Sequence, residues 1–274
     1  MDKKEVIKIV SEIDREFQKE KVPVRNREMQ AFLRFGKKTG IDFPITGNHW
    51  IRKTISDWYK MVYGNKLLID FSPGTGVIAI NHEPYAIKFP RVYGTVSVNP
   101  FDWIEDITDA MLSSIPQEMW RPVGEAILTQ FYSFQHIEHL PRKCSDDLSS
   151  AVGHILSQKR NCGLSKWASQ QSLEKTLKHF ISNKGGSYKK IHDLEKLHRK
   201  AVELGLPPLS VDLVSIVECS PSARYAETGE NEEYSLQVAI EAFNASLFGI
   251  GCIARSMFNL PEPKIRTSIR YYPE

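Results

Sequence analysis

The chain has 274 residues, of which 41% are hydrophobic and 25% are charged, and its formal net charge is +3. These values are typical of a soluble globular protein with one large or two modest domains, and this length buries a core without disulfides. The four cysteines lie far apart without a Cys-x-x-Cys pair, which argues against a disulfide framework or a zinc ribbon. The charged N-terminus has no long apolar run, so we expect no signal peptide and a cytoplasmic location.

Helical periodicity dominates the first 64 residues. Apolar side chains recur three or four positions apart between Val6 and Phe17, as on one face of a helix. Gly64 is a natural stop for the last helix of this region. The predicted helices cover Lys3–Phe17, Arg27–Lys38 and His49–Val62.

The pattern then changes to short segments rich in aromatic and β-branched residues. Turn residues separate these segments, for example in Ser72-Pro73-Gly74. We therefore predict a small antiparallel sheet of three or four strands, which begin at Lys66, Gly76, Tyr85 and Val92. After the cap signal Asn99-Pro100, two helices are expected, at Phe101–Ser113 and Gln117–His136.

A charged stretch with a proline, LPRKCSDDL from Leu140, suggests a domain boundary. The rest of the chain is predicted to be helical, with helices at Asp146–Gln158, Leu164–Ile181, Asp193–Leu204, Ser210–Cys219 and about Glu232–Met257. The predicted fold class is thus α+β and mostly helical. It comprises a mixed region with a small antiparallel sheet at residues 1–140 and a helical bundle with a C-terminal tail at residues 141–274.

The last predicted helix is apolar on nearly all sides. Glu241 and Asn244 interrupt its apolar run, which is shorter than the roughly 20 residues that a membrane span needs, so we expect no membrane segment. A helix of this kind is buried on more than one face, either inside a bundle or against a second subunit. We predict a homodimer through its apolar residues, which are Phe243, Leu247, Phe248 and Ile250.

Positive charge concentrates in residues 178–200. Seven lysines and arginines stand there against two acidic residues, a net charge of +5 that leaves −2 for the rest of the chain. Such a concentration favours a polyanionic partner such as RNA. The alternative is a solvated helical face.

Several sequence elements of the second half occur together in one known family. They are the helix pair DLSSAVGHILSQKRNCGLSKWASQQSLEKTLKHFI, the Gly185-Gly186 loop before His192-Asp193-Leu194, Arg224-Tyr225, and the long apolar helix. In this order they resemble a HEPN domain (higher eukaryotes and prokaryotes nucleotide-binding) over roughly residues 142–258. Ala226 stands where the family often has proline, and residues 1–140 resemble no family that we recognise.

The resemblance implies a bundle of four or five helices that is often a homodimer. It also implies a role in phage defence, toxin–antitoxin or RNA-processing systems, or as the partner of a nucleotidyltransferase. HEPN RNases carry an arginine a few positions before a histidine, which would act as a general base. None of the eight histidines here has such an arginine. We therefore expect a non-catalytic protein that binds RNA or a nucleotide-containing ligand. The alternatives are an RNase with a displaced, metal-independent site and a structural dimerisation module.

The residues expected to contact a ligand lie in the basic segment and in the elements that resemble the family. The candidate residues are Lys175, Lys178, Lys189, Lys190, His192, Asp193, Arg224 and Tyr225. Asp193 is expected to cap the helix that follows it. His192 is then either a core-facing histidine or a ligand contact. Lys175 and Lys178, three residues apart, are expected to line one basic pocket with Arg224, or to form a solvated edge.

Other motifs favour no catalytic, metal or cofactor site. His136, His139 and Cys144 have spacing suited to zinc, but Pro141 breaks the helix and no fourth ligand is evident. Two mixtures of aromatic and cationic residues are more typical of packing and a solvated tail than of base stacking. They lie at Arg52–Lys60 and Arg266–Tyr272. No phosphate-binding loop or nucleophile elbow occurs.

Overall fold

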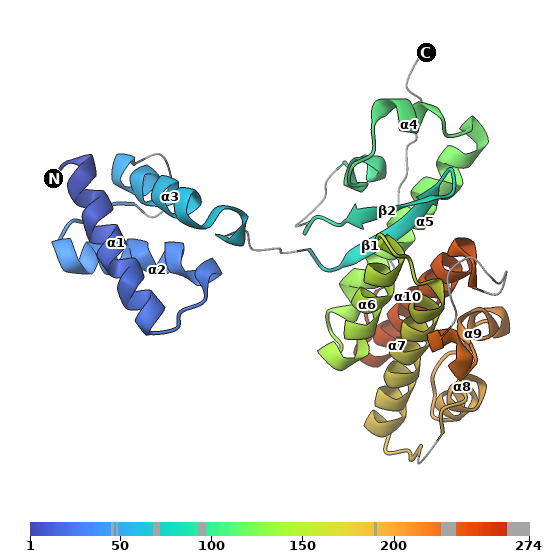
Figure 1. Cartoon of the computed structure of the whole chain (residues 1–274). Coiled ribbons are helices and arrows are strands. Elements are labelled where there is room, and N and C mark those ends of the chain that lie inside the picture. The colour runs from blue at the N-terminus through green and yellow to red at the C-terminus, as the bar shows by residue number, and fades with distance from the viewer. Residues whose placement is uncertain are drawn as a thin grey trace. The chain divides into compact units, whose positions relative to one another are not determined.

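A computed structural model describes residues 1–44, 47, 49–67, 72–92, 97–188, 191–225 and 234–261. The chain forms two compact units, Met1–Phe71 and Ser72–Glu274 (Figure 1). Within the described residues both units are mostly helical, and the second also contains a small antiparallel sheet, so the predicted fold class is confirmed.

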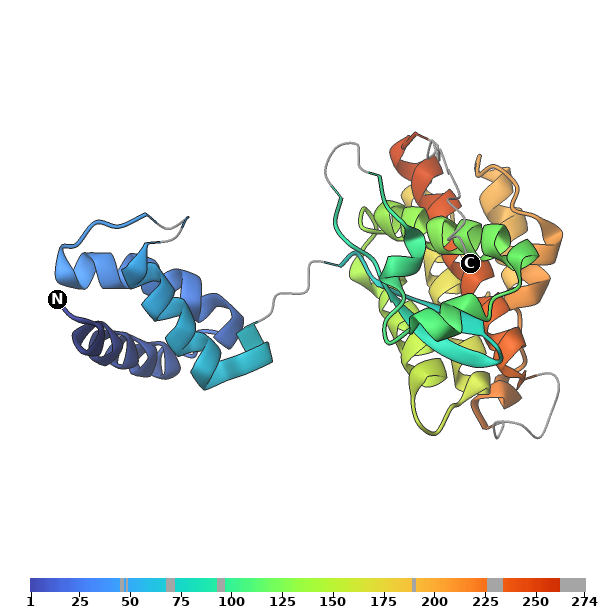
Figure 2. The same ribbon diagram turned by 90° about the horizontal axis from the view of Figure 1, so that it is seen from above.

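The first unit is a group of three helices, as the sequence predicted (Figure 2). They are α1 (Lys3–Lys19), α2 (Val24–Thr39) and α3 (Trp50–Tyr63), and α3 runs into a 3-10 turn at Gly64–Leu67. Asp2 caps α1 by accepting hydrogen bonds from the backbone of Lys4 and Glu5, and the Glu5 carboxylate accepts one from the Asp2 backbone. The apolar face of each helix turns inward. The shared core contains Val6, Val10, Ile13, Phe17, Ala31, Phe32, Phe35, Phe43, Ile51, Ile55 and Tyr59.

A buried polar network joins the three helices of this unit. The Tyr63 hydroxyl donates to Asp14 Oδ2 at 2.6 Å, and Arg27 Nη1 donates to the Tyr63 hydroxyl at 2.7 Å. Tyr59 is fully buried and packs its ring against Trp58 and Tyr63. The aromatic residues at the end of α3 therefore pack in the core. The sequence favoured this packing role over base stacking for the segment Arg52–Lys60.

The second unit begins with a β-hairpin. Strands β1 (Thr75–Ile80) and β2 (Glu83–Lys88) pair antiparallel, with Ile80 opposite Glu83. The two residues between them, Asn81 and His82, have positive φ of 51° and 65°, as in a two-residue hairpin turn. Two of the predicted strands are thus present. The segment from Lys66 starts in a 3-10 turn, and residues 68–71 and 93–96 lie outside the described part of the chain.

The helix predicted at Phe101–Ser113 is wrong over most of its length. A 3-10 turn at Pro100–Trp103 is followed by extended Ile104, which pairs with Ile87 beside the hairpin. The backbone N–H of Glu105 donates to the Ala86 carbonyl at 2.9 Å. Burial of Ile104 against the hairpin thus outweighs local helix propensity, and only the short helix α4 (Asp109–Ser113) remains.

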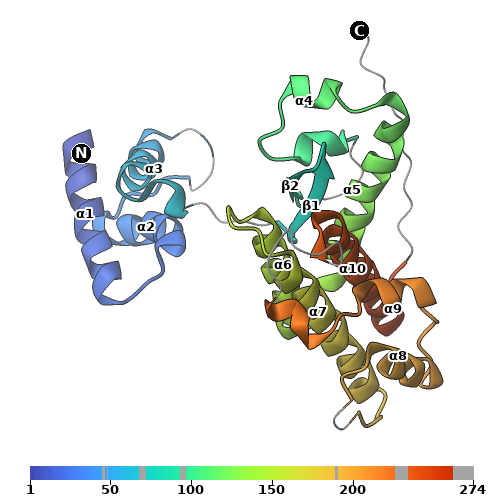
Figure 3. The ribbon, with the colours of Figure 1, turned by 45° about the vertical axis from the view of Figure 1, so that its right-hand side comes forward.

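The remaining helices form a bundle, which confirms the predicted architecture of this half (Figure 3). The bundle comprises α5 (Gln117–Ile137), α6 (Asp146–Leu156), α7 (Cys162–Asn183), α8 (Leu194–Glu203), α9 (Val211–Val217) and α10 (Leu236–Phe258). Helices α7 and α10 form the central pair. α6 packs against α7, and α5 and α9 pack against α10.

The hairpin and α5 share the core of this bundle, although the sequence predicted a domain boundary near residue 140. Gln130 on α5 donates to the Val77 carbonyl at 2.9 Å and accepts from the Val77 N–H at 3.1 Å. α5 also packs along α10. The charged stretch after Leu140 is a tight connection rather than a linker. Cys144 is fully buried there, and its carbonyl accepts a hydrogen bond from Ser172 on α7. The compact unit therefore starts at Ser72.

Helix α10 is long and apolar enough to span a membrane by length and composition alone. A core helix passes the same test, and α10 is packed between α5, α7 and α9. Phe243, Leu247 and Ile250 are buried in this core, whereas Phe248 remains 44% exposed. The dimer surface predicted on these four residues is therefore wrong for three of them, because their apolar area is used inside the chain.

Candidate ligand-binding face of α7

One face of α7 carries a row of large polar and aromatic side chains. Trp167, Gln170, Glu174 and Lys178 follow one another at intervals of three or four residues, so they lie along one side of the helix. Helix α8 and the 3-10 turn η4 (Pro221–Tyr225) also pack against α7. The row therefore meets both segments in which the sequence placed ligand contacts.

Near the C-terminal end of this row, Glu174 is the centre of a polar cluster. Its Oε1 lies 2.6 Å from Lys178 Nζ and 3.0 Å from His192 Nδ1. The Glu174 side chain is only 6% exposed, whereas that of His192 is 76% exposed. Because a carboxylate only accepts hydrogen bonds, Nδ1 carries the proton, and Nε2 of a neutral ring is free to act as an acceptor or a base. We call Glu174, Lys178 and His192 the Glu174 cluster.

The two residues of the His192-Asp193 pair have different roles. Asp193 is the N-cap of α8, and its Oδ1 accepts the Lys196 N–H at 2.9 Å, as predicted. Hydrogen bonds from the backbone and side chain of Lys196 lower the pKa of the Asp193 carboxyl. The core-facing interpretation of His192 is wrong, because its side chain is exposed and Leu194 takes the buried position at the start of α8.

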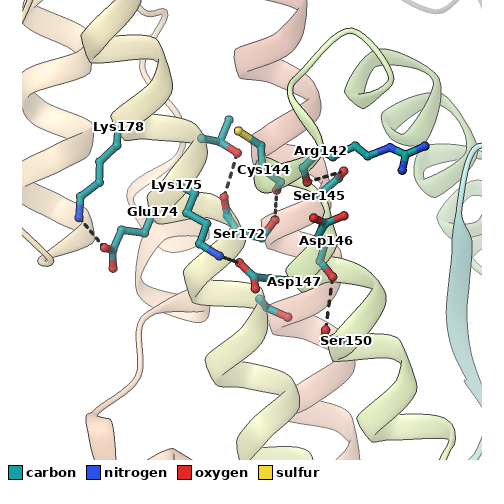
Figure 4. Close-up of polar contacts among 12 residues, drawn as sticks. Arg142, Cys144, Ser145, Asp146, Asp147, Ser150, Ser172, Glu174, Lys175 and Lys178 are labelled. Atoms are coloured by element: carbon teal, nitrogen blue, oxygen red, sulfur yellow. Dashed lines mark hydrogen bonds and ion pairs between the residues drawn. The ribbon is translucent and has the colours of Figure 1, made fainter.

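Lys175 does not join Lys178 in a shared pocket. It pairs with Asp147 of α6, at 2.5 Å between Nζ and Oδ2. Figure 4 shows Lys175 directed toward α6, while Lys178 reaches Glu174 on its own helix. Each lysine thus has a carboxylate of its own, which reduces the positive potential that the sequence suggested.

At the N-terminal half of the row, the Arg224 guanidinium lies close to two aromatic rings. Its guanidinium carbon is 4.7 Å from the Trp167 ring centre and 5.6 Å from that of Tyr225. Tyr225 is 80% exposed. Gln170 helps to hold this turn in place, because its Oε1 accepts hydrogen bonds from the Cys219 N–H at 2.7 Å and the Cys219 thiol at 2.9 Å. We call Trp167, Arg224 and Tyr225 the Arg224 stack.

The candidate residues therefore separate into two sites on α7. Eleven positions separate Trp167 from Lys178, or about 16 Å along the helix axis. Lys178, His192 and Asp193 are at one site, and Arg224 and Tyr225 are at the other. Lys189 and Lys190 lie outside the described residues, so their predicted role stays a prediction.

Residues 137–245, from the end of α5 into α10, match the model of the HEPN domain family. The chain contains a HEPN domain. The match confirms the resemblance that the sequence suggested for roughly residues 142–258. No curated protein matches the chain, and no solved structure matches it either. Both the Glu174 cluster and the Arg224 stack lie within the matched residues of the HEPN domain.

Sequence reasoning missed two contributors to the candidate sites on α7. The sequence did not identify Trp167 as the ring that contacts Arg224. It also did not identify Gln170 as a residue that helps to hold the turn carrying Arg224 in place. Their spacing from Glu174 and Lys178 was the available signal, because four such residues on one side of a helix must meet a polar neighbour. The partner segment lies about 50 positions away in the chain, and its pairing is not visible in the sequence.

His136, His139 and Cys144, whose spacing in the sequence suits zinc, have separate surroundings. Among the described residues no group of three or more His, Cys, Asp or Glu side chains is placed to hold a metal ion. The ring of His139 packs against Phe258, and burial raises the pKa of the Cys144 thiol. Burial and nearby Arg255 lower the pKa of His136.

Proposed function

We propose that the HEPN domain binds single-stranded RNA or a nucleotide-containing ligand without cleaving it. Arg224 contacts a phosphate and Tyr225 stacks on a base. One observation carries the proposal: the Arg224 guanidinium lies over the Trp167 ring and within 5.6 Å of the Tyr225 ring centre, and Tyr225 is exposed. We further propose that the chain acts in the cytoplasm, in a defence, toxin–antitoxin or RNA-processing system.

The chemistry of the Arg224 stack suits such a ligand. A guanidinium that lies over a ring keeps its edge N–H groups available for a bidentate contact with phosphate. Because the two rings already restrict Arg224, little conformational entropy is lost when a ligand binds. The exposed Tyr225 ring offers a surface for any base, since base–aromatic stacking is sequence-tolerant.

The absence of the family's nuclease motif supports binding rather than cleavage. Arg224 is followed by YAETGENEEYS, which contains no histidine. Within the described residues Arg224 and His192 contact different parts of α7, so they do not form one arginine–histidine site.

Fluorescence anisotropy with a short labelled RNA at low salt tests the proposal. We expect saturable binding with intact RNA recovered, with or without EDTA. Tyr225→Ala should weaken binding about tenfold, because stacking contributes roughly 1–3 kcal/mol per base. Tyr225→Phe should bind like the parent, because it keeps the ring. No binding at low salt, or equal binding by Tyr225→Ala, would contradict the proposal.

A metal-independent RNase is the second candidate, and the Glu174 cluster favours it. His192 Nδ1 is held by a buried carboxylate, an arrangement that leaves Nε2 able to accept a proton from an attacking 2′-hydroxyl. Cleavage of RNA in EDTA that both His192→Ala and Glu174→Gln abolish would establish this activity. Intact RNA after long incubation with the parent protein would exclude it.

A further inference from the structure

One side of α2, in the first unit, is exposed and carries no acidic residue. On the side of α2 toward α1, Arg34 and Lys38 both pair with Glu16 of that helix. On the side toward α3, Glu28 accepts a hydrogen bond from Ser56 at 2.7 Å. Apart from Lys38, the exposed residues of α2 fall within one arc of the helix. We call this arc the outer face of α2, and it comprises Arg25, Asn26, Met29, Gln30, Leu33 and Lys37.

Apolar residues occupy the middle of the outer face, and cations occupy its two ends. Met29 and Leu33, one turn apart, are 57% and 54% exposed. Arg25 lies one turn before Met29, and Lys37 lies one turn after Leu33, so the four side chains form a row of about 18 Å. Two adjacent large apolar side chains that are more than half exposed gain free energy when another molecule covers them.

The two ends of this row keep their positive charge. The first unit, residues 1–71, contains 15 lysines and arginines against 10 acidic residues, a net charge of +5. Among the described residues of this unit, the cationic side chains of the ion pairs are those of Arg27, Arg34 and Lys38. Neither Arg25 nor Lys37 takes part in these pairs, so both are available to a partner with negative charge.

Helix α3 adds two cations beside the row. Ser56 marks the side of α3 that meets α2, and Lys53 and Lys60 lie three residues before it and four residues after it, on the same side. Both lysines are exposed, and Asp57 is the single acidic residue of α3. A molecule that covers the apolar middle of the outer face therefore meets more positive than negative charge around it.

This arrangement fits a protein partner better than a nucleic acid. An apolar centre with a charged rim is the usual anatomy of a protein–protein interface, and apolar residues one turn apart are the anchors by which helices recognise one another. Contacts with nucleic acid are instead made mostly by cations and hydrogen-bonding groups to phosphates. Met29 and Leu33 have no such groups, although they occupy the middle of the outer face.

We propose that the outer face of α2 binds an amphipathic, acidic helix of a partner protein. Two large apolar side chains of the partner, one turn apart, pack on Met29 and Leu33. An acidic residue one turn beyond each of them pairs with Arg25 or Lys37. Apolar burial supplies the attraction, and the charges fix the position of the partner helix along α2. The proposal is independent of RNA binding, because the Arg224 stack lies in the second unit.

A labelled synthetic helix is the probe for the first test, with the full-length protein. The probe is an alanine-based peptide of about 20 residues, because shorter helices are marginal in water. Two leucines lie four positions apart at its centre, and a glutamate lies four positions outside each of them. Fluorescence anisotropy should show saturable binding, and replacing both leucines by serine should weaken it about tenfold. No saturable binding, or equal binding of the serine peptide, overturns the proposal.

Substitutions in the first unit test the site itself. Met29→Glu and Leu33→Glu should each weaken binding of the acidic peptide about tenfold, because a carboxylate then faces a leucine. Both positions are more than half exposed, so the variants should stay folded, which thermal melts check. The matched control is Met61→Glu. Met61 is 75% exposed but lies five residues after Ser56 and so points away from α2, and this variant should bind like the parent. An equal loss in Met61→Glu overturns the proposed site.

A charge exchange tests the two ends of the row. The double variant Arg25→Glu with Lys37→Glu should bind the acidic peptide about fivefold more weakly, as expected for two exposed ion pairs. It should bind more tightly a peptide in which lysines replace the two glutamates, since the pairs then form with reversed sign. If the folded double variant does not gain affinity for the lysine peptide, the charge pairing is wrong and the proposal fails.

Competition with nucleic acid separates the two classes of partner. A DNA duplex should not displace the acidic peptide at physiological salt, and displacement would show that the outer face of α2 binds nucleic acid instead. Tyr225→Ala, which removes the proposed base contact in the second unit, should bind the peptide like the parent. A loss of RNA binding in that variant thus leaves the test of the outer face intact, whereas a matching loss of peptide binding overturns the independence of the two surfaces.

Discussion

Each of the two sites on α7 contains a cation, but the surroundings of that cation differ between them. In the Glu174 cluster, the cation Lys178 lies 2.6 Å from a buried carboxylate. In the Arg224 stack, the cation lies against two aromatic rings, and no ion pair of Arg224 is found among the described residues. A paired cation attracts a phosphate weakly, because the carboxylate cancels most of its field. A cation held by rings keeps its full charge and a fixed orientation.

The same contrast extends to the basic segment at residues 178–200. Lys196 pairs with Asp193, and Arg199 pairs with Glu195, in both cases within one turn of α8. Exposed pairs of this kind contribute only about 0–1 kcal/mol to stability, but they reduce the local potential. The number of cations in a segment therefore overestimates its attraction for RNA when acidic residues are one helical turn away.

The largest expected effect is the difference between Arg224 and Lys178. Arg224→Ala should weaken RNA binding roughly 30-fold, or about 2 kcal/mol, through loss of charge-assisted hydrogen bonds. Lys178→Ala should change it less than about threefold, since its carboxylate partner already compensates its charge. Anisotropy titrations at two salt concentrations measure both. The log–log salt slope should become shallower by about 0.7 in Arg224→Ala alone.

Arg224→Lys is the matched control for this comparison. It keeps the charge but loses the planar fork and the stacking on Trp167, so we expect an intermediate affinity. Equal losses from Arg224→Ala and Lys178→Ala would show that the two sites contribute alike, and the contrast between them would then be wrong.

Glu174→Gln tests the electrostatics of the Glu174 cluster. It removes the charge that compensates Lys178 while keeping a similar shape, so the unfolding free energy should fall by about 1–2 kcal/mol. RNA affinity should rise slightly, because Lys178 then carries an uncompensated charge. Urea denaturation and anisotropy measure the two effects. If affinity falls in this folded variant, the carboxylate itself contributes to ligand binding, and our account of the cluster fails.

Acidification should destabilise the fold through a histidine that lies outside both sites. His198 on α8 accepts the Leu209 N–H at 2.9 Å through Nε2, and burial lowers the pKa of this histidine. As pH falls below the ordinary value of 6.5, the unfolded chain takes up a proton that the folded chain resists. The unfolding free energy should therefore decrease from about pH 6.5 down to the lowered pKa, and then level off.

His198→Gln is the matched variant for this effect. The glutamine carbonyl can still accept the Leu209 N–H, but it does not titrate, so the loss of stability on acidification should be smaller. His136 and His179 also have lowered pKa values and account for part of the remaining loss. Urea denaturation at pH 7.5 and 5.5 compares parent and variant. An unchanged pH dependence would exclude His198 as a source.

Most helices and the hairpin could be predicted from the sequence because their signals are local. The apolar spacing in α1, the glycine after α3 and the cap Asp193 all act within a few residues. The features that the sequence did not predict depend on contacts between residues far apart in the chain. Ile104 lies in a segment predicted to be helical but pairs with Ile87, and Gln130 joins α5 to a strand 53 positions earlier. For the same reason the sequence named Arg224 but not Trp167, since the position of that ring depends on packing between distant segments.

His192→Ala should have the smallest effect of these substitutions. The side chain is exposed and, in the part of the chain that the structure describes, hydrogen-bonds to Glu174, whose carboxylate keeps Lys178 as a partner. Stability should thus change by less than about 0.5 kcal/mol, as for most exposed positions. RNA affinity should not change either, because the phosphate contact is assigned to Arg224. Thermal melts and anisotropy check both expectations. A marked loss of affinity with unchanged stability would make His192 a ligand contact, and the binding face would then extend over both sites on α7.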